Sequence, residues 1–425
     1  MCKLSNIKIR VLGSGREVGR AAVAVEKNER FILFDYGVNF DERDIPQLPL
    51  TIPPSRIDGV FISHPHLDHV GATPLLYISS KPMSYATPVT KDISRIMLED
   101  FFRLSSYYLP FEYKEIENFL LYTRTISYSS ELDVGSWKIS FRNAGHLPGS
   151  MMISIDNGRR RILYTGDVNT IDTRLVSAAN ISGLEADTLI IEGTYGDTDH
   201  PSREEVERDF IESIKEVVEN GGVVLVPSFS LGRSQEILML LAERIPNLDI
   251  KYDGMIRVIT ETLMSYKNYI NKPELLEKAT KLFTEVSDWN MRRKVWREPG
   301  VIVASAGMLK GGPALYYLKR IADEKNSAVF LVSFQGRNTP GRMLLEGGVF
   351  MENGPRVISR VQWFDFSSHA GLSGLLSIAK NVKGLERVII IHTDPDVGES
   401  FKKTIKEELG VEAILPSIGD IIDLR

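Results

Sequence analysis

The amino-acid sequence predicts an α/β protein with two domains, and three observations support this. The chain has 425 residues, which is more than one hydrophobic core usually serves. Its first part, to about residue 194, is rich in short apolar runs that are typical of strands. From about residue 195 to 360, apolar strands alternate with helical patterns, which indicates a parallel α/β unit.

The first part should consist mainly of strands, with one short helix over residues 70–78. The Asp156-Asn157-Gly158 sequence suits a tight turn, so the strands on either side of it should form a hairpin. The predicted strands of this part are residues 7–12, 21–26, 31–35, 58–63, 137–142, 151–155, 161–165 and 188–192.

The remainder of the chain alternates between the two kinds of element. The helix predicted over residues 201–218 begins at Pro201-Ser202 and has acidic residues in its first turn. Two further helices should follow Gly232 and Gly312 and end near residues 244 and 322. The predicted strands are residues 222–227, 300–304, 328–332, 387–391 and 412–415, and the last two helices are residues 373–380 and 398–409.

The composition is that of a soluble globular protein, with 43% hydrophobic and 25% charged residues. Cys2 is the single cysteine, so intrachain disulfides and thiolate-rich zinc sites are excluded. No apolar run reaches the ~20 residues that span a bilayer, and we expect a cytoplasmic protein. The net charge of −5 is unusual for a nucleic-acid-binding protein, although a nuclease can concentrate positive charge locally.

The strongest chemical signal is the sequence Ser63-His64-Pro65-His66-Leu67-Asp68-His69, directly after an apolar strand. Packing gives no reason for three imidazoles and a carboxylate within six positions. Imidazole and carboxylate groups are ligands for zinc, and also for manganese or iron. Alternate residues of a loop can point the same way, so this segment can face two metal ions.

Four other residues stand where strands end. His146 and His392 are two of only seven histidines, and Asp35 and Asp167 also follow apolar runs. Taken singly, each histidine is more often an ordinary hydrogen-bonded residue, and each aspartate is more often a turn residue. Together with the histidine-rich segment, they favour a shared metal centre.

The order of these residues resembles the four motifs of the metallo-β-lactamase fold. Three further sequences, Glu192-Gly193-Thr194-Tyr195, Phe366-Ser367-Ser368-His369-Ala370 and His392, resemble the extra motifs of the β-CASP subgroup. Residues 227–236 and 335–342 also resemble stretches of its cap domain. The resemblance implies a metallo-β-lactamase αββα sandwich, residues 1–194 and 361–425, with a β-CASP α/β cap inserted at 195–360.

Within that family, a histidine at the position of His392 is typical of RNA-processing members, whereas DNA-repair members typically carry valine. The Phe366–Ala370 sequence resembles the cleavage-and-polyadenylation endonuclease and its archaeal relatives more than RNase J. The chain lacks a KH-type extension and the extra C-terminal domain of RNase J, so it is similar to the short archaeal and bacterial forms.

The resemblance implies that two zinc ions, or manganese as the alternative, activate a hydroxide that hydrolyses RNA and leaves a 3′ hydroxyl and a 5′ phosphate. Exonuclease and endonuclease action both remain open. The implied ligands are His64, His66, His146 and Asp167 for one ion, and Asp68, His69, Asp167 and His392 for the other. The implied catalytic residues are Asp68, His369 as proton donor, Glu192 as its orienting partner, and Asp35, which would hold a ligand histidine.

The expected partner is single-stranded RNA, with a homodimer or a processing complex left open and no membrane. Two basic runs, residues 159–161 and 292–294, are more typical of solvated faces. The candidate RNA contacts are Arg233, Ser333, Gln335, Arg337, Arg342, Ser367 and Ser368. For each of them, hydrogen bonding within its own loop is an equal alternative.

Three alternatives compete with a ribonuclease. A small-molecule hydrolase of the same superfamily would not need the cap, and a DNA nuclease does not fit His392. A non-catalytic subunit of a processing complex would be expected to lose metal ligands, and this chain keeps every matched position.

Overall fold

The computed structural model describes residues 7–424, so Cys2 lies outside the described residues. The chain divides into two compact units. Unit 1 contains the described residues up to Ile171, then Ala178–Asp199 and His369 onward, and unit 2 contains Asp172–Ser177 and His200–Ser368. The expected cap, by comparison, was residues 195–360.

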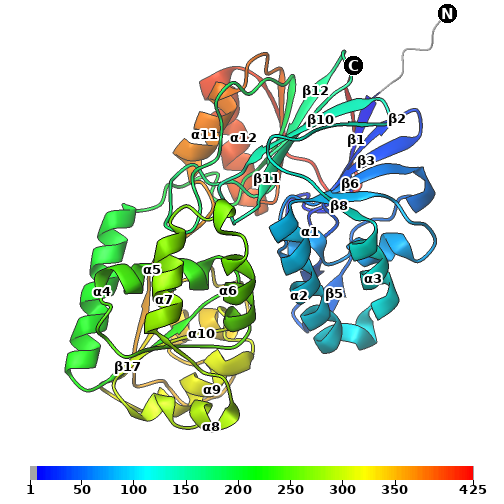
Figure 1. The fold of residues 1–425 in the computed structure, drawn as a ribbon. Coiled ribbons are helices and arrows are strands. Elements are labelled where there is room, and N and C mark those ends of the chain that lie inside the picture. Colours follow the sequence, from blue (N-terminus) through cyan, green and yellow to red (C-terminus); the bar gives the residue numbers. More distant parts are fainter. Residues whose placement is uncertain (1–6, 425) are drawn as a thin grey trace, which may run out of the picture. The chain divides into compact units, whose positions relative to one another are not determined.

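Unit 1 is a sandwich of two mixed seven-stranded sheets (Figure 1). The first sheet has the order β22 (Ile421–Leu424), β1 (Ile7–Val11), β2 (Val23–Lys27), β3 (Arg30–Phe34), β6 (Ile57–Phe61), β7 (Ser84–Ala86) and β8 (Thr123–Thr125). The second has the order β21 (Glu412–Ile414), β20 (Arg387–Ile391), β13 (Thr188–Glu192), β12 (Arg161–Tyr164), β11 (Met151–Asp156), β10 (Trp137–Asn143) and β9 (Glu131–Val134).

Alternation along these strands divides their apolar side chains between the two faces of each sheet. In β3, Ile32 and Phe34 join the core between the sheets, whereas Phe31 and Leu33 face the outer layer. The outer layer of the first sheet contains α2 (Pro88–Ser105) and α3 (Tyr113–Leu121). The outer layer of the second contains α11 (Leu372–Asn381) and α12 (Pro395–Leu409), which gives the predicted αββα order (Figure 1).

Unit 2 is a parallel α/β domain, as the alternating pattern predicted. Its sheet has the order β16 (Thr284–Glu285), β15 (Ile250–Asp253), β17 (Gly300–Ala304), β14 (Val223–Pro227), β18 (Ala328–Leu331) and β19 (Arg360–Trp363). Residues of α4 (Arg203–Glu219), α5 (Arg233–Arg244), α6 (Ile256–Met264) and α7 (Pro273–Leu282) pack with one face of it. Residues of α9 (Gly312–Ile321) and α10 (Pro340–Gly347) pack with the other.

Several short elements complete the two units. In unit 1 they are α1 (Leu67–Val70), β4 (Asn39–Phe40), β5 (Pro46–Gln47), and the 3-10 turns η1 (Pro54–Arg56), η2 (Thr73–Tyr77) and η3 (Ser106–Tyr108). In unit 2 they are η4 (Lys267–Tyr269), α8 (Trp289–Arg292) and η5 (Val295–Arg297).

The helix predicted over residues 70–78 is wrong. The α-helix there is α1, which ends at Val70, and a 3-10 turn follows at Thr73–Tyr77. Pro74 has no backbone N–H, and it occupies the first turn of that short element, where none is needed. In the described part of the chain, no helix is long and apolar enough to cross a membrane.

Candidate metal centre

All ten candidate metal-ligating and catalytic residues lie in unit 1, and several of them stand at or shortly after the end of a strand. Asp35 follows β3, His64 follows β6, and His392 follows β20. Strands β3 and β6 run parallel and are neighbours, so their carboxyl ends meet at one edge of the first sheet. The β13–β20 pair brings Glu192 and His392 to one edge of the second.

The predicted ligands form two groups beside Asp167, whose side chain is buried, and Glu192 and His369 form a third group with it. One oxygen, Oδ2, lies 3.5 Å from His64 Nε2 and 3.8 Å from His146 Nε2. The other, Oδ1, lies 3.3 Å from His69 Nε2 and 3.7 Å from His392 Nδ1. Each oxygen of one carboxylate therefore faces a different pair of histidines.

His66 and Asp68 complete the two groups. His66 Nδ1 lies 3.4 Å from His146 Nε2, on the side of the first group. Asp68 Oδ2 lies 3.3 Å from His392 Nε2 and 3.9 Å from His69 Nε2, on the side of the second. The structure thus brings together all seven residues that the sequence predicted as ligands.

The buried donor atoms of this cluster fit cations. His64 Nε2, His69 Nε2 and Asp167 Oδ1 are buried and have no hydrogen-bond partner among the described residues. Leaving such atoms without a partner is costly, and a bound cation satisfies both an imidazole lone pair and a carboxylate oxygen. Imidazole nitrogen and carboxylate oxygen are also the donor set that suits zinc.

His64 and His66, on the side of the first group, have lowered pKa values, whereas His69, on the side of the second, has a raised one. Burial lowers the pKa of His66 to about 4 and holds that of His64 well below its usual value. Burial also opposes a proton on His69, but the Asp167 and Asp35 carboxylates outweigh it and raise the pKa of His69. Neutral imidazoles keep a lone pair for a metal, and a metal ion can replace a proton beside a carboxylate.

Asp35 fixes the orientation of His69. Its Oδ2 lies 2.7 Å from His69 Nδ1, which leaves His69 Nε2 directed at Asp167. The same carboxylate accepts hydrogen bonds from the Ser63 backbone N–H, the Ser63 hydroxyl and the Tyr164 hydroxyl, each at 2.7 Å. The loop after Asp35 requires a glycine, because a Cβ on Gly37 would lie 1.8 Å from the Asp68 carbonyl oxygen.

Glu192 and His369 form the predicted pair. His369 Nδ1 lies 2.8 and 2.9 Å from the two oxygens of Glu192, which also accepts hydrogen bonds from the Val168 N–H and the Thr194 hydroxyl. The opposite ring atom, His369 Nε2, lies 3.9 Å from Asp167 Oδ2. Burial lowers the pKa of His369, but Glu192 and Asp167 outweigh it and raise that pKa to about 9.

Sequence reasoning missed three supporting residues, Ser63, Tyr164 and Thr194. The Thr194 hydroxyl lies 3.2 Å from His392 Nδ1 and donates to Glu192, so it joins two candidate site residues. Ser63 directly precedes His64 and Tyr164 ends a predicted strand, so position was their sequence signal, whereas Thr194 lies within the quoted Glu192–Tyr195 motif. A tyrosine in an apolar strand is otherwise typical of a hydrophobic core.

The seven candidate RNA contacts all lie in unit 2, and their surroundings differ. Gln335 is buried and donates to the Gly307 and Ser333 carbonyl oxygens, both at 3.0 Å. Arg342 pairs with Glu346 one helical turn away. The remaining candidates are Ser333, which is buried, Arg337, which is exposed, Ser367, and the pair Arg233 and Ser368, whose Nη2 and Oγ atoms are 3.5 Å apart.

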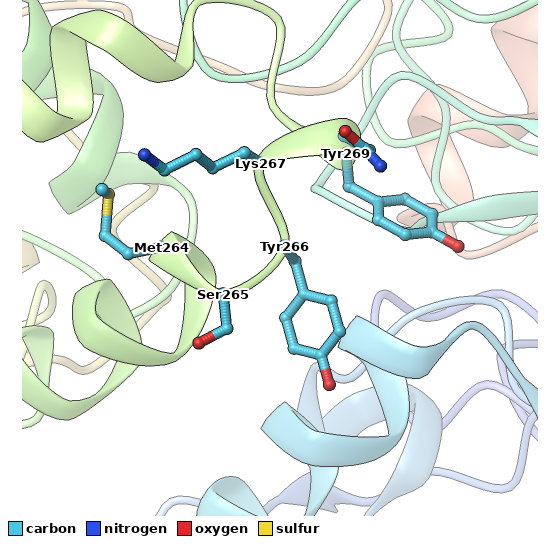
Figure 2. A pocket seen from close by; sticks show the side chains of 6 residues that line it. Met264, Ser265, Tyr266, Lys267 and Tyr269 are labelled. Atoms are coloured by element: carbon cyan, nitrogen blue, oxygen red, sulfur yellow. The ribbon is translucent and has the colours of Figure 1, made fainter.

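A surface pocket follows α6 in unit 2 and is lined by the consecutive residues Met264–Tyr269 (Figure 2). The rings of Tyr266 and Tyr269 belong to it, with centroids 6.5 Å apart. None of the predicted site residues lines this pocket.

Three family descriptions match the chain. Residues 15–216 match the metallo-β-lactamase superfamily, residues 218–344 match the β-CASP domain, and residues 354–416 match the Zn-dependent metallo-hydrolase RNA specificity domain. The RNase aCSPSF2 of Saccharolobus solfataricus is 47% identical over 99% of this chain and 86% of that protein. The chain belongs to the β-CASP family of metallo-β-lactamase-type hydrolases.

Other relatives support this family assignment. The Probable RNase MJ4 of Methanocaldococcus jannaschii is 34% identical over 96% of this chain and 98% of that protein. The transcription termination factor FttA of Pyrococcus horikoshii is 33% identical over 99% of this chain and 71% of that protein. A solved protein of unknown function from Enterococcus faecalis has a similar fold, with a TM-score of 0.59 and 15% identity over 99% of this chain and 100% of that one.

Proposed function

We propose that this chain is a ribonuclease that holds two zinc ions, or manganese in their place, and hydrolyses RNA phosphodiester bonds to a 3′ hydroxyl and a 5′ phosphate. The observation that carries the proposal is Asp167, whose two oxygens face two separate sets of histidines. The RNA specificity match and the RNase relatives support RNA as the substrate.

One metal ion would be held by His64, His66, His146 and Asp167, and the other by Asp68, His69, Asp167 and His392. Bound in this way, the ions would supply a water of lowered pKa and positive charge to neutralise the phosphate. Asp35 holds Nδ1 of His69, so that the lone pair of Nε2 stays on the metal side. Thr194 and Glu192 keep His392 and His369 in place.

His369 is the proposed proton donor to the leaving 3′ oxygen. Glu192 binds its Nδ1 atom, so Nε2 is the atom that faces the centre. The side chain remains 19% exposed, whereas His64 is completely buried, so His369 is the more accessible to a substrate. A positioned general acid of this kind contributes about 10²- to 10⁴-fold to a rate.

The first test uses an internally labelled RNA that carries a 5′ monophosphate or a 5′ triphosphate. Wild-type protein should hold about two divalent ions and cleave the RNA, because both donor sets are complete. Asp167→Ala should lose metal and cleavage together, and Asp396→Ala, a change of an exposed aspartate on α12, should alter neither. A folded wild-type protein that binds no divalent ion, or that cleaves no RNA with zinc or manganese, would refute the proposal.

The same experiment decides the mode of cleavage. Release of mononucleotides that depends on a 5′ monophosphate would identify a 5′→3′ exonuclease. Discrete internal fragments that do not depend on the 5′ end would identify an endonuclease.

The role of His369 is separable from metal binding. His369→Ala should keep the metal content of the wild type and lower the cleavage rate about 10²- to 10⁴-fold. Metal analysis and single-turnover cleavage on the same sample check this. Loss of a metal ion from the variant would instead assign His369 as a ligand.

A further inference from the structure

The segment Trp289–Arg297 of unit 2 carries concentrated positive charge. It contains four cationic residues and no acidic one, in a chain whose net charge is −5. Helix α9 adds Lys319 and Arg320, again without an acidic residue between Gly312 and Ile321. Figure 1 shows α8 and α9 side by side, and the structure joins them through the rings of Trp289 and Tyr316.

Aromatic rings lie among these cations. The ring centroids of Trp289 and Tyr316 are 5.0 Å apart, and Trp289 is 52% exposed. The guanidinium of Arg320 lies 3.3 Å from the centroid of Tyr316, and that of Arg292 lies 5.6 Å from Trp289. We call the whole surface the basic–aromatic patch, comprising Trp289, Arg292, Arg293, Lys294, Arg297, Tyr316 and Arg320.

Of the five cations of this patch, Arg292 is fixed, Arg320 is half-buried over the Tyr316 ring, and the other three are exposed. Arg292 is held by two hydrogen bonds to the buried Asp253, at 2.7 and 2.8 Å. Arg293, Lys294 and Arg297 are exposed, and in the described chain no carboxylate forms an ion pair with any of them. Asp288 caps the start of α8, because its side chain accepts hydrogen bonds from the Asn290 and Met291 N–H groups.

The other basic run of the sequence, residues 159–161, differs in this respect. Arg161 pairs with Asp156 and Glu185, and Arg160 pairs with Glu386. Two of the three arginines of that run are therefore paired locally, as expected for a solvated face. The two runs look alike in sequence, but the patch in unit 2 keeps three exposed cations that form no ion pair within the described chain, which leaves more charge available for a polyanion.

We propose that the basic–aromatic patch binds a stretch of single-stranded RNA, with phosphates beside Arg293, Lys294 and Arg297 and a base stacked on Trp289. Cations that neutralise phosphates release condensed counterions, which supplies binding free energy. An exposed aromatic ring stacks on a base whatever its identity. An acidic protein segment would use the cations but not the indole face. The assignment rests on the proposed function, in which RNA is the substrate.

The test measures binding of a short fluorescent oligouridylate across a salt series, in protein made cleavage-deficient by His369→Ala. Arg293→Gln with Lys294→Gln should weaken binding and reduce the slope of log K against log salt by about 1.4, since each single-strand phosphate contact contributes about 0.7. The matched control, Lys215→Gln with Lys278→Gln, removes two exposed lysines from α4 and α7 and should leave the slope unchanged.

Stacking is tested separately from charge. Trp289→Ala should weaken binding about tenfold, and Trp289→Phe, which keeps a ring, should retain most of the affinity. Each variant must unfold at the wild-type temperature, which excludes a general loss of structure.

The inference would be overturned if the variant with Arg293→Gln and Lys294→Gln and the variant Trp289→Ala both bound RNA with the affinity and salt slope of the wild type. It would also be overturned if the wild type bound oligoglutamate more tightly than RNA of equal charge. If the wild type cleaves RNA and the patch variants bind it normally, the patch assignment fails and the proposed ribonuclease stands. If the patch variants lose binding in a protein that cleaves no RNA, the proposed ribonuclease fails and the patch stands.

Discussion

At the scale of single residues, the hydroxyl groups of Ser63 and Tyr164 decide how Asp35 is held. Both donate to Asp35 Oδ2, and the Ser63 N–H donates to Oδ1. The carboxylate is completely buried, so these bonds replace water and keep one oxygen against His69 Nδ1. The imidazole is thereby held in one orientation, with Nδ1 against Asp35 and Nε2 toward Asp167.

Asp35→Asn should lower zinc affinity about 10- to 100-fold, because the amide binds His69 Nδ1–H less strongly than a carboxylate does. Competition with a chelating dye measures this. Asp58→Asn, a change of a partly exposed aspartate on β6 that pairs with Arg30, is the control and should leave affinity unchanged. Equal zinc affinity of Asp35→Asn and wild type would show that Asp35 does not support a ligand.

The ligand candidates were predictable because clustered histidines and strand-terminal aspartates have no packing reason to exist. The supporting hydroxyls were not. Tyr164 ends an apolar strand and its ring stacks on Phe34 at a centroid distance of 4.9 Å, so its sequence context is that of a core residue. Its hydrogen bond joins residues 129 positions apart, which no local pattern reveals.

At the scale of elements, strands with strict alternation or continuous apolar runs were predicted nearly to the residue. The predicted strands at residues 300–304 and 387–391 are confirmed as β17 and β20. The long helix α2 received no prediction, although Thr87 caps it and Pro88 opens it. Its weak signal has a physical cause, since the polar residues Thr90 and Ser94 interrupt the buried face of the helix.

His200, just before α4, contacts Asp365, just after β19, with Nδ1 of the imidazole 2.8 Å from Oδ2 of the carboxylate. This contact joins two elements of unit 2. Burial raises the pKa of Asp365, but the bonds from His200 and the Ser367 N–H outweigh it and lower that pKa. A lowered carboxyl pKa stabilises the folded state above the unfolded value of about 4, and this stabilisation is lost as the pH falls through the folded value.

Asp365→Asn should therefore destabilise the protein by about 1.5–3 kcal/mol near neutral pH, as for other hydrogen bonds to a charged group. The difference from wild type should shrink as the pH falls below about 4. Urea unfolding at several pH values measures it. A difference that stays constant down to pH values well below 4 would contradict the role of the Asp365 charge.

At the scale of the whole molecule, the segment Asp172–Ser177 belongs to unit 2 although its neighbours on both sides belong to unit 1. Arg174 holds it there. Its guanidinium pairs with Glu207 and Glu243, and the backbone N–H groups of Arg174 and Leu175 donate to Glu236. The sequence predicted an inserted cap, but it did not predict that Asp172–Ser177 belongs to the same unit, because the glutamates that pair with Arg174 lie 33 to 69 positions away.

Arg174→Met should destabilise unit 2 by about 3–5 kcal/mol, because it removes the cation that is hydrogen-bonded to the buried Glu207 and leaves only the more distant Arg203, at 3.6 Å. Chemical denaturation, followed by the intrinsic fluorescence of the tryptophans of unit 2, checks this. Arg208→Met on α4, where the arginine is 58% exposed, should change stability by less than about 1 kcal/mol. Similar stability of both variants would show that the network contributes nothing net.

The pairing of β22 with β1 and of β20 with β13 also governs when the metal centre can form during synthesis. The chain leaves the ribosome from its amino end, so most of unit 2 is available for folding before β20 and β22 exist. Until residues 387–424 have emerged, the edge of β1 lacks a neighbour and His392 is missing from the second group of donors. In the proposed ribonuclease, the second group of donors would therefore stay incomplete in a nascent chain until His392 has left the ribosome and β20 has paired with β13.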